Sequence, residues 1–86
     1  MQTTAADAIR QRVQIRRDLP SPAERRALRL AAGLTTIEMA AAVGVSKQAV
    51  TSWENGTRSP RGASLERYVD ALRALRDLHE ETAETV

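Results

Sequence analysis

A row of short hydrogen-bonding side chains lies on one face of the segment 47–55. At about 100° per residue, five polar residues fall within an arc of about 140°: Lys47, Gln48, Thr51, Ser52 and Asn55. The opposite arc, about 100° wide, holds Ala49, Val50 and Trp53. Such polar groups can read base edges in the major groove of DNA, where Gln suits adenine and Lys suits guanine. The segment therefore predicts a helix that buries one face and presents the other to DNA.

The rest of the sequence offers little for catalysis or metal binding. Cys is absent, which excludes disulfides, thiolate zinc sites and cysteine nucleophiles together. His79 is the single histidine, so a metal site built from several histidines is excluded and histidine-based catalysis is not expected. We therefore expect no enzyme activity, no metal and no cofactor.

Two short helices are predicted on either side of Val43-Gly44-Val45-Ser46. Thr35, with Glu38 three residues later, has the pattern of a capping box and opens the first helix. Ser46 is the cap residue that opens the second. Gly44 permits a positive φ between them without a Cβ clash. Two short helices joined by such a turn form a helix-turn-helix, which we place at residues 36–55.

The whole chain is predicted to be all-α, with five helices at about 5–18, 22–32, 36–43, 47–55 and 62–80. Pro20 and Pro22 separate the first helix from the second. Gly33 ends the second helix. We divide the chain into an N-terminal helical extension (1–19), a helix-turn-helix domain (20–80) and a frayed acidic tail (81–86).

The composition suits a small helical core. The 86 residues are one domain's worth of chain; 42% are apolar, 15 of them are Ala, and Phe is absent. Trp53 could stack on a base, but its place beside Ala49 and Val50 favours the core. The expected core residues are Ala27, Leu28, Leu34, Ile37, Met39, Ala40, Val43, Val45, Val50, Trp53, Leu65, Tyr68, Val69, Leu72 and Leu75.

The net charge of +2 is unevenly distributed along the chain. Residues 1–34 carry seven Arg and three acidic residues, whereas residues 63–86 carry three Arg and six acidic residues. Four arginines fit either a DNA-contacting arm or a solvated helix face: Arg10, Arg12, Arg16 and Arg17. No apolar run approaches the ~18–20 residues of a membrane span, and the N-terminus lacks the apolar stretch of a signal peptide. We therefore expect a cytoplasmic protein.

The segment 24–60 resembles the Cro and lambdoid-repressor type of helix-turn-helix, also called the xenobiotic-response-element family. An Arg-rich helix is followed by matching residues in the family's order: Gly33-Leu34-Thr35, Glu38-Met39-Ala40, Val43-Gly44-Val45-Ser46, Val50, Trp53-Glu54-Asn55-Gly56, Arg58 and Pro60. The later stretch PRGASLERYVDAL is similar to the helix that closes this fold in small bacterial and phage regulators. The resemblance implies a five-helix, lambda-repressor-like domain in a DNA-binding regulator of transcription.

The resemblance also implies roles for particular residues. A partly buried ion pair is expected between Arg29 and Glu54. Base contacts are expected from Lys47, Gln48, Thr51 and Ser52, and contacts to the DNA backbone from Thr35, Thr36, Asn55, Arg58 and Arg61. The family often has Gln where this chain has Thr36; Thr reaches a phosphate but is too short to brace the recognition helix as well.

Two functions from different classes fit these features. The first is a sequence-specific regulator of double-stranded DNA, most simply a repressor that occupies its operator. The second is the antitoxin of a toxin–antitoxin pair, in which residues 1–19 hold the protein partner. A helical bundle that has lost DNA binding is a third alternative, and the polar face of 47–55 argues against it.

A homodimer on a palindromic operator is expected, because one such module buries only about 600–1,000 Å² on DNA. Family proteins typically dimerise, so the resemblance points the same way. The candidate dimer seam on the last helix is Ala71, Leu75 and Leu78, spaced i, i+4 and i+7. A competing seam is Ile9 with Val13, and a monomer with Leu78 as an ordinary exposed apolar residue is the third alternative.

Overall fold

The structure, a computed structural model, describes the backbone of residues 4–84 and the side chains of residues 4–82. Five helices follow one another along the chain: α1 (Ala5–Asp18), α2 (Pro22–Ala31), α3 (Thr36–Val43), α4 (Lys47–Asn55) and α5 (Gly62–Glu84). Residues 4–84 contain no β-strand. The predicted all-α, five-helix fold is confirmed.

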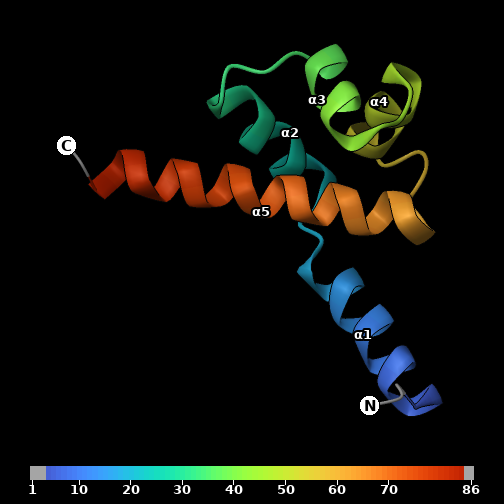
Figure 1. Ribbon diagram of the computed structural model, residues 1–86. Coiled ribbons are helices and arrows are strands. Elements are labelled where there is room, and N and C mark those ends of the chain that lie inside the picture. The colour runs from blue at the N-terminus through green and yellow to red at the C-terminus, as the bar shows by residue number, and fades with distance from the viewer. Residues whose placement is uncertain (1–3, 85–86) are drawn as a thin grey trace.

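The long helix α5 is the platform of the molecule (Figure 1). Helices α2, α3 and α4 lie on one side of it, and α1 extends away on the other. Helix α2 contacts both α4 and α5, while α3 contacts α4 and α5. Helix α1 packs mainly against α5. The helix-turn-helix formed by α3 and α4 is therefore held by α2 and α5 together.

The helices begin and end where side-chain chemistry favours a boundary. Thr4, Ser21 and Ser46 are N-caps, each accepting a hydrogen bond from the backbone N–H three residues later. Pro22 occupies the first turn of α2, where no intrahelical N–H is needed. Gly44 and Gly56 end α3 and α4 with φ of 81° and 75°, a left-handed conformation that favours glycine.

The core lies between α5 and the helix-turn-helix. At its centre the rings of Trp53 and Tyr68 lie 4.7 Å apart between centroids, at an angle of 42°. The buried apolar residues are Met39, Ala40, Val43, Val50, Trp53, Leu65, Tyr68, Val69, Leu72 and Leu75, and all ten belong to the predicted core. Leu28, Leu34 and Val45 are partly buried and pack against it.

The prediction that Ala27 and Ile37 belong to the core is wrong. Ala27 is exposed, and the Ile37 side chain is 63% exposed. The buried positions of α3 are Met39, Ala40 and Val43, and Ile37 lies about 160° around the helix from Met39 and about 120° from Val43. On α2 the inward face carries Leu28 and two arginines in place of Ala27.

Helix α5 also continues further than the sequence suggested. The expected frayed tail at 81–86 is helical as far as Glu84, because residues 63–84 contain neither Gly nor Pro to end the helix. The Thr82 hydroxyl donates a 3.0 Å hydrogen bond to the Leu78 carbonyl one turn earlier. The last two residues of the expected tail, 85 and 86, lie outside the described residues.

Candidate nucleic-acid interface

The two faces of α4 have opposite environments. Val50 is 0% exposed and Trp53 is 6% exposed, so both are buried against the core. Five residues of α4 are expected to contact DNA. Ser52 is half-buried, and the other four are exposed: Lys47, Gln48, Thr51 and Asn55. Helix α4 lies at the outer edge of the molecule (Figure 1), and its polar residues are open to solvent there.

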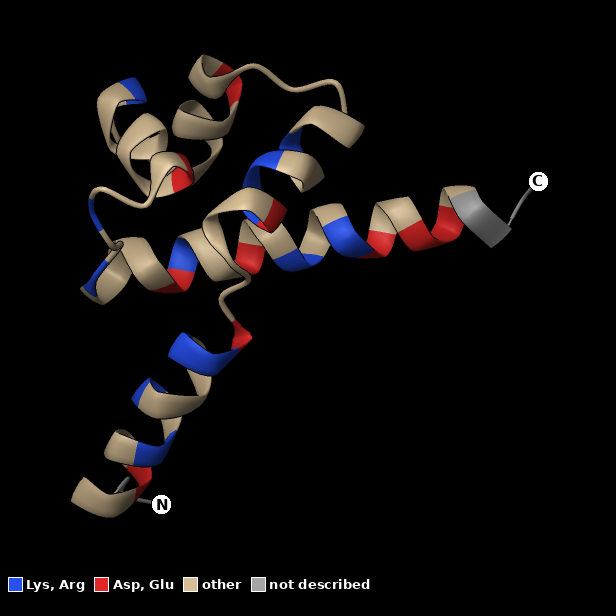
Figure 2. Ribbon diagram, turned by 180° about the vertical axis from the view of Figure 1, so that it is seen from behind, with Lys and Arg blue, Asp and Glu red and all other residues tan. Residues whose placement is uncertain are grey.

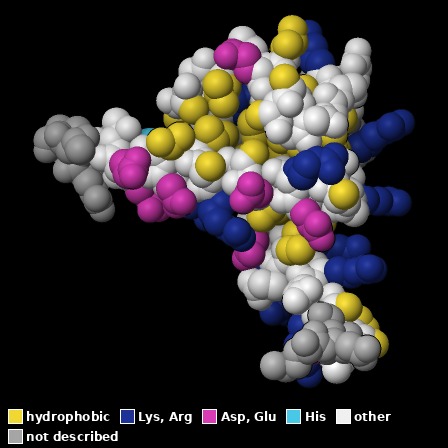
Figure 3. Space-filling view, in the orientation of Figure 1, with side chains coloured by type: hydrophobic (Ala, Val, Ile, Leu, Met, Phe, Trp, Pro, Cys, Tyr) yellow, Lys and Arg dark blue, Asp and Glu magenta, His cyan; other side chains and the backbone are white. Residues whose placement is uncertain are grey.

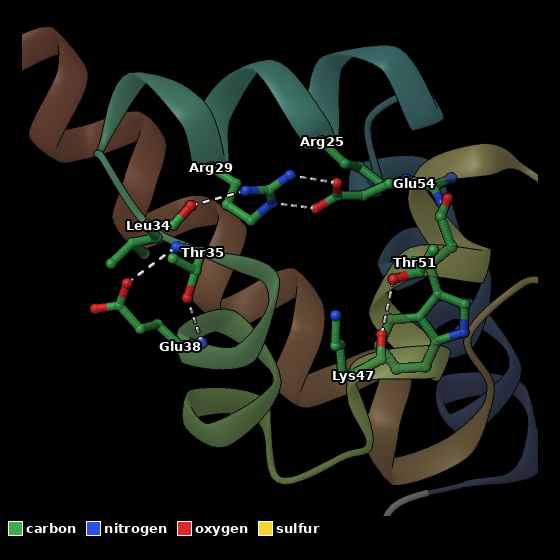
Figure 4. Close-up of polar contacts among 9 residues, drawn as sticks. Arg25, Arg29, Leu34, Thr35, Glu38, Lys47, Thr51 and Glu54 are labelled. Carbon is green, nitrogen blue, oxygen red and sulfur yellow. Dashed lines mark hydrogen bonds and ion pairs between the residues drawn. The ribbon is translucent and has the colours of Figure 1, made fainter.

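Thr51 differs from the other residues of this face because its hydroxyl is already engaged. Its Oγ1 donates a 3.0 Å hydrogen bond to the carbonyl of Lys47, as Figure 4 shows. The hydroxyl oxygen keeps its acceptor capacity and the γ-methyl remains. Thr51 can therefore accept from a base or contact a thymine methyl, but it is less suited to donate.

The turn between α3 and α4 is braced from α5. The N–H groups of Gly44 and Val45 both donate to the Ala40 carbonyl, at 2.8 and 3.0 Å. The last carbonyls of a helix have no partner within the helix. One of them at the end of α3, that of Val43, accepts a 2.7 Å hydrogen bond from Arg67 Nε. Sequence patterns did not indicate this role for Arg67, because a charged residue on a long helix looks the same whether it faces solvent or a carbonyl.

The ion pair expected between Arg29 and Glu54 is bidentate and buried (Figure 4). Arg29 Nε lies 2.7 Å from Glu54 Oε2, and Nη2 lies 2.9 Å from Oε1. The two side chains are 8% and 5% exposed. Arg29 Nη1 also donates to the Leu34 carbonyl at 2.7 Å. Hydrogen bonding to Glu54 raises the pKa of Arg29. The pair therefore joins α2, the loop that follows it, and α4.

A second arginine of α2, Arg25, also holds the C-terminal end of α4. It is 8% exposed, and its Nη1 donates to the Trp53 carbonyl at 2.9 Å while its Nε donates to the Pro20 carbonyl at 2.7 Å. Burial lowers the pKa of this guanidinium. The sequence analysis missed this residue. The available signal was spacing, since Arg25 and Arg29 lie one turn apart on the same face of α2.

The N-terminus of α3 carries its own carboxylate. Thr35 Oγ1 accepts from the Glu38 N–H at 3.1 Å, and Glu38 Oε1 accepts from the Thr35 N–H at 3.0 Å (Figure 4). The hydrogen bond from the Thr35 backbone is the main cause of a lowered pKa at Glu38. The Glu38 carboxylate thus already binds the backbone N–H of Thr35, a residue that was expected to contact a phosphate. Thr36 is half-buried beside it.

A groove beside α4 combines polar and cationic side chains. It has a volume of about 520 Å³ and lies between α4 and the loop that leads to α5. Gln48 and Ser52 line it from α4, and Arg58, Ser59 and Arg61 line it from the loop. The loop is held to α4 because the N–H groups of Thr57 and Arg58 donate to the Ser52 carbonyl, at 3.0 and 3.4 Å. The groove therefore brings expected base-contacting and backbone-contacting residues together.

The candidate dimer residues on α5 lie in different environments. Leu75 is 8% exposed and belongs to the core of the single chain, and Ala71 is half-buried against that core. Leu78 is 55% exposed. On α1, Ile9 and Val13 are 62% and 41% exposed. Leu78 is thus the member of the α5 strip that solvent reaches.

In the described part of the chain, no three His, Asp or Glu side chains gather as a metal site would require. No helix there combines the length and apolarity that a membrane crossing requires. The sequence was compared with families of known proteins. The model of a family described as helix-turn-helix matches residues 26–77, which are more than half of the chain. No curated protein and no solved structure matches the chain.

Proposed function

The chain belongs to the helix-turn-helix family of DNA-binding transcriptional regulators of the Cro and lambdoid-repressor type, and from this premise we propose that it is a sequence-specific repressor that occupies an operator in double-stranded DNA. The observation that carries the proposal is the contrast between the two faces of α4. Val50 and Trp53 hold one face in the core, while Gln48 and its polar neighbours face solvent.

Helix α4 enters the major groove in this proposal, with its N-terminal half nearest the bases. Gln48 pairs with an adenine through its amide, and Lys47 donates to a guanine. Ser52 and Thr51 lie one turn further on, where Thr51 acts as an acceptor or through its methyl group. These four side chains supply the discrimination between sequences.

Contacts to the DNA backbone surround this reading face. Arg58 and Arg61 project from the loop after α4 and bind phosphates, and Asn55 assists at the end of the helix. Thr36 and Thr35 form the remaining contact at the start of α3. The Glu38 carboxylate at that helix end makes this the weakest of the phosphate contacts.

Repression is the simplest outcome of such binding, because a protein seated on an operator excludes polymerase without any further contact. Activation needs an additional surface that touches polymerase. A homodimer strengthens the effect: two copies on a palindrome place their α4 helices about one helical turn, ~34 Å, apart on one face of the DNA. We propose Leu78 as the exposed centre of the dimer contact.

The test is selection of bound oligonucleotides with wild type, Gln48→Ala and Gln11→Ala. Gln48→Ala is expected to relax preference at one or two base pairs and to cost about 1–3 kcal/mol on the selected site. Gln11→Ala removes the same side chain from an exposed position on α1 and leaves the motif unchanged. An intact motif in Gln48→Ala would require a different reading face.

A second candidate function rests on the exposed apolar residues of α1. Ile9 and Val13 lie one turn apart on a helix that has no buried residue. An antitoxin would use this strip to hold a toxin, and DNA binding would then serve to control the pair's own operon. Co-purification with a small protein encoded beside it, lost in Ile9→Glu, would favour this function over a simple repressor.

A further inference from the structure

Helix α1 carries four arginines but contributes little to the core. None of its residues is buried, and it packs mainly against α5. It is fixed at its C-terminal end, where Leu19 packs against the core and Asp18 Oδ2 accepts from Arg73 Nη2 at 3.2 Å. The folding of the domain therefore does not explain why this helix carries so many cations.

Two of these arginines, Arg12 and Arg16, lie beside the start of α5. They line one hollow of about 410 Å³ together with Gly62, Ala63 and Glu66. Arg16 also lines a second hollow, of about 510 Å³, with Ser59, Pro60 and Arg61. The positions of Arg12 and Arg16 are four residues apart, so both side chains project from the same face of α1.

The second hollow joins α1 to the groove beside α4. Ser59, Pro60 and Arg61 line both of them, so these loop residues connect the two depressions. A track of cationic residues runs from the reading face of α4 over the loop to α1: Arg58, Arg61, Arg16 and Arg12. In Figure 3 dark blue side chains follow this edge of the molecule, from the start of α5 onto α1.

We propose that Arg12 and Arg16 extend the DNA interface of α4, binding backbone phosphates that flank the base pairs read by Gln48. The proposal rests on the proposed DNA recognition by α4. Duplex DNA is the occupant that the track fits, because a duplex carries a phosphate charge about every 1.7 Å along its axis and continues past the recognised bases. The arginines of the track likewise continue along the surface beyond the face of α4 that is proposed to read bases.

The distribution of acidic residues agrees with this orientation. Acidic residues gather toward the C-terminal half of α5, at the end of the molecule opposite the track (Figure 2). Acidic residues also lie on α1 itself, at Asp7 and Asp18, and Glu66 lines the hollow beside Arg12 and Arg16. Its carboxylate repels a phosphate placed there. If DNA lies along the track, Glu66 therefore weakens binding, whereas the arginines strengthen it.

The other two arginines of α1 supply a matched control. Arg10 Nη1 pairs with Asp7 at 3.2 Å, and Arg17 lines a different hollow with Asp18 and Arg73. Both lie roughly 100° or more around the helix from Arg12 and Arg16. Removing either pair of arginines takes the same charge from the same helix, so a difference between the two variants reports contact rather than net charge.

The experiment compares Arg12→Gln/Arg16→Gln with Arg10→Gln/Arg17→Gln in the full chain. Affinity for the duplex selected by wild type, with about 10 flanking base pairs on each side, is measured as a function of salt. Losing two phosphate contacts lowers the slope of log K against log salt by about 1.8. If the contacts add nothing at 1 M salt, that is a loss of about 60-fold at 0.1 M. The control variant is expected to bind as wild type does.

Two further arms separate the explanations. A duplex that ends at the last recognised base pair removes the difference between wild type and Arg12→Gln/Arg16→Gln, because the flanking phosphates are gone. Glu66→Gln tightens binding to the long duplex, by roughly fivefold for one charge near a phosphate in water. Circular dichroism of each variant checks that α1 remains helical.

Several results would overturn the inference while leaving DNA recognition by α4 intact. One is an equal loss in the two double variants, which indicates net charge alone. Another is wild-type binding by Arg12→Gln/Arg16→Gln, or a loss only of binding to a co-purified protein partner, which assigns this face to that protein. If wild type selects no duplex at all, the proposed function and this inference fall together.

Discussion

Breaking the ion pair between Arg29 and Glu54 tests how the recognition helix is held. We consider Arg29→Met, Glu54→Leu and the double variant. Each single substitution leaves the other charged group in the interior, where the side chains are only 8% and 5% exposed. Arg29→Met also removes the donor to the Leu34 carbonyl. The double variant leaves no buried charge and replaces the pair with apolar groups of similar size.

The structure sets the expected magnitudes. Removing one partner of a buried ion pair costs about 3–5 kcal/mol, because the remaining charge keeps its desolvation penalty. A chain of this length has a total stability of about 4–13 kcal/mol, so either single variant is expected to lose roughly a quarter of it or more. The double variant is expected to cost at most about 2 kcal/mol, including the unpaired Leu34 carbonyl. The coupling energy is then at least about 4 kcal/mol.

The stability of wild type and the three variants is measured by urea denaturation. The signal is the fluorescence of Trp53, which is the single tryptophan and is buried. Arg73→Met is the control: its pair with Asp18 is exposed, so it should cost less than about 1 kcal/mol. Arg29→Lys, which keeps the charge but loses the bidentate geometry, gives an intermediate value if the singles are too unstable to measure. Additive costs for Arg29→Met and Glu54→Leu would refute the pair as a stabilising unit.

Three other substitutions follow from the core and the turn. In the described structure nothing hydrogen-bonds to the buried Tyr68 hydroxyl, so Tyr68→Phe should raise the free energy of unfolding by about 1–2 kcal/mol, and a loss would indicate an internal water partner. Burial raises the pKa of Tyr68 to about 12, so the tyrosine ionises first in the unfolded chain. Wild-type stability should therefore fall by about 2 kcal/mol between pH 10 and 12, a decline that Tyr68→Phe lacks. Gly44→Ala should cost about 1–2 kcal/mol because φ is 81°, and an unchanged melting temperature would contradict the left-handed turn. Val50→Asp buries an unpaired charge and should cost several kcal/mol; a stable, folded variant would show that this face of α4 is not in the core.

The elements of the fold were predictable because their boundaries depend on local chemistry. Ser46 caps α4 through its own side chain, and Gly44 and Gly56 end α3 and α4 with positive φ. The faces of α4 were predictable as well, since a helix of known start places every residue by rotation alone. The end of α5 was not, because fraying depends on a balance of small propensities over several residues rather than on one stop signal.

The contacts that hold α4 were less accessible from the sequence. Arg29 and Glu54 were expected only through the family resemblance. Arg25 and Arg67 each donate to a main-chain carbonyl, and no side-chain pattern marks the acceptor. Ile37 shows the converse: an apolar residue in a short helix was assigned to the core, although it lies about 160° around the helix from Met39 and the structure leaves it exposed.

The arginine contacts around the helix-turn-helix also bear on how binding proceeds. Arg67 fixes the turn before α4, Arg25 fixes the Trp53 carbonyl, and Arg29 fixes the Glu54 side chain. The face of α4 that we propose to read DNA is therefore assembled in the free protein, and we expect association to involve no folding of α4. The heat-capacity change of binding then reflects only the surface buried at the contact, without the large term of coupled folding. We expect the association rate to be set by electrostatic steering and orientation rather than by a conformational step.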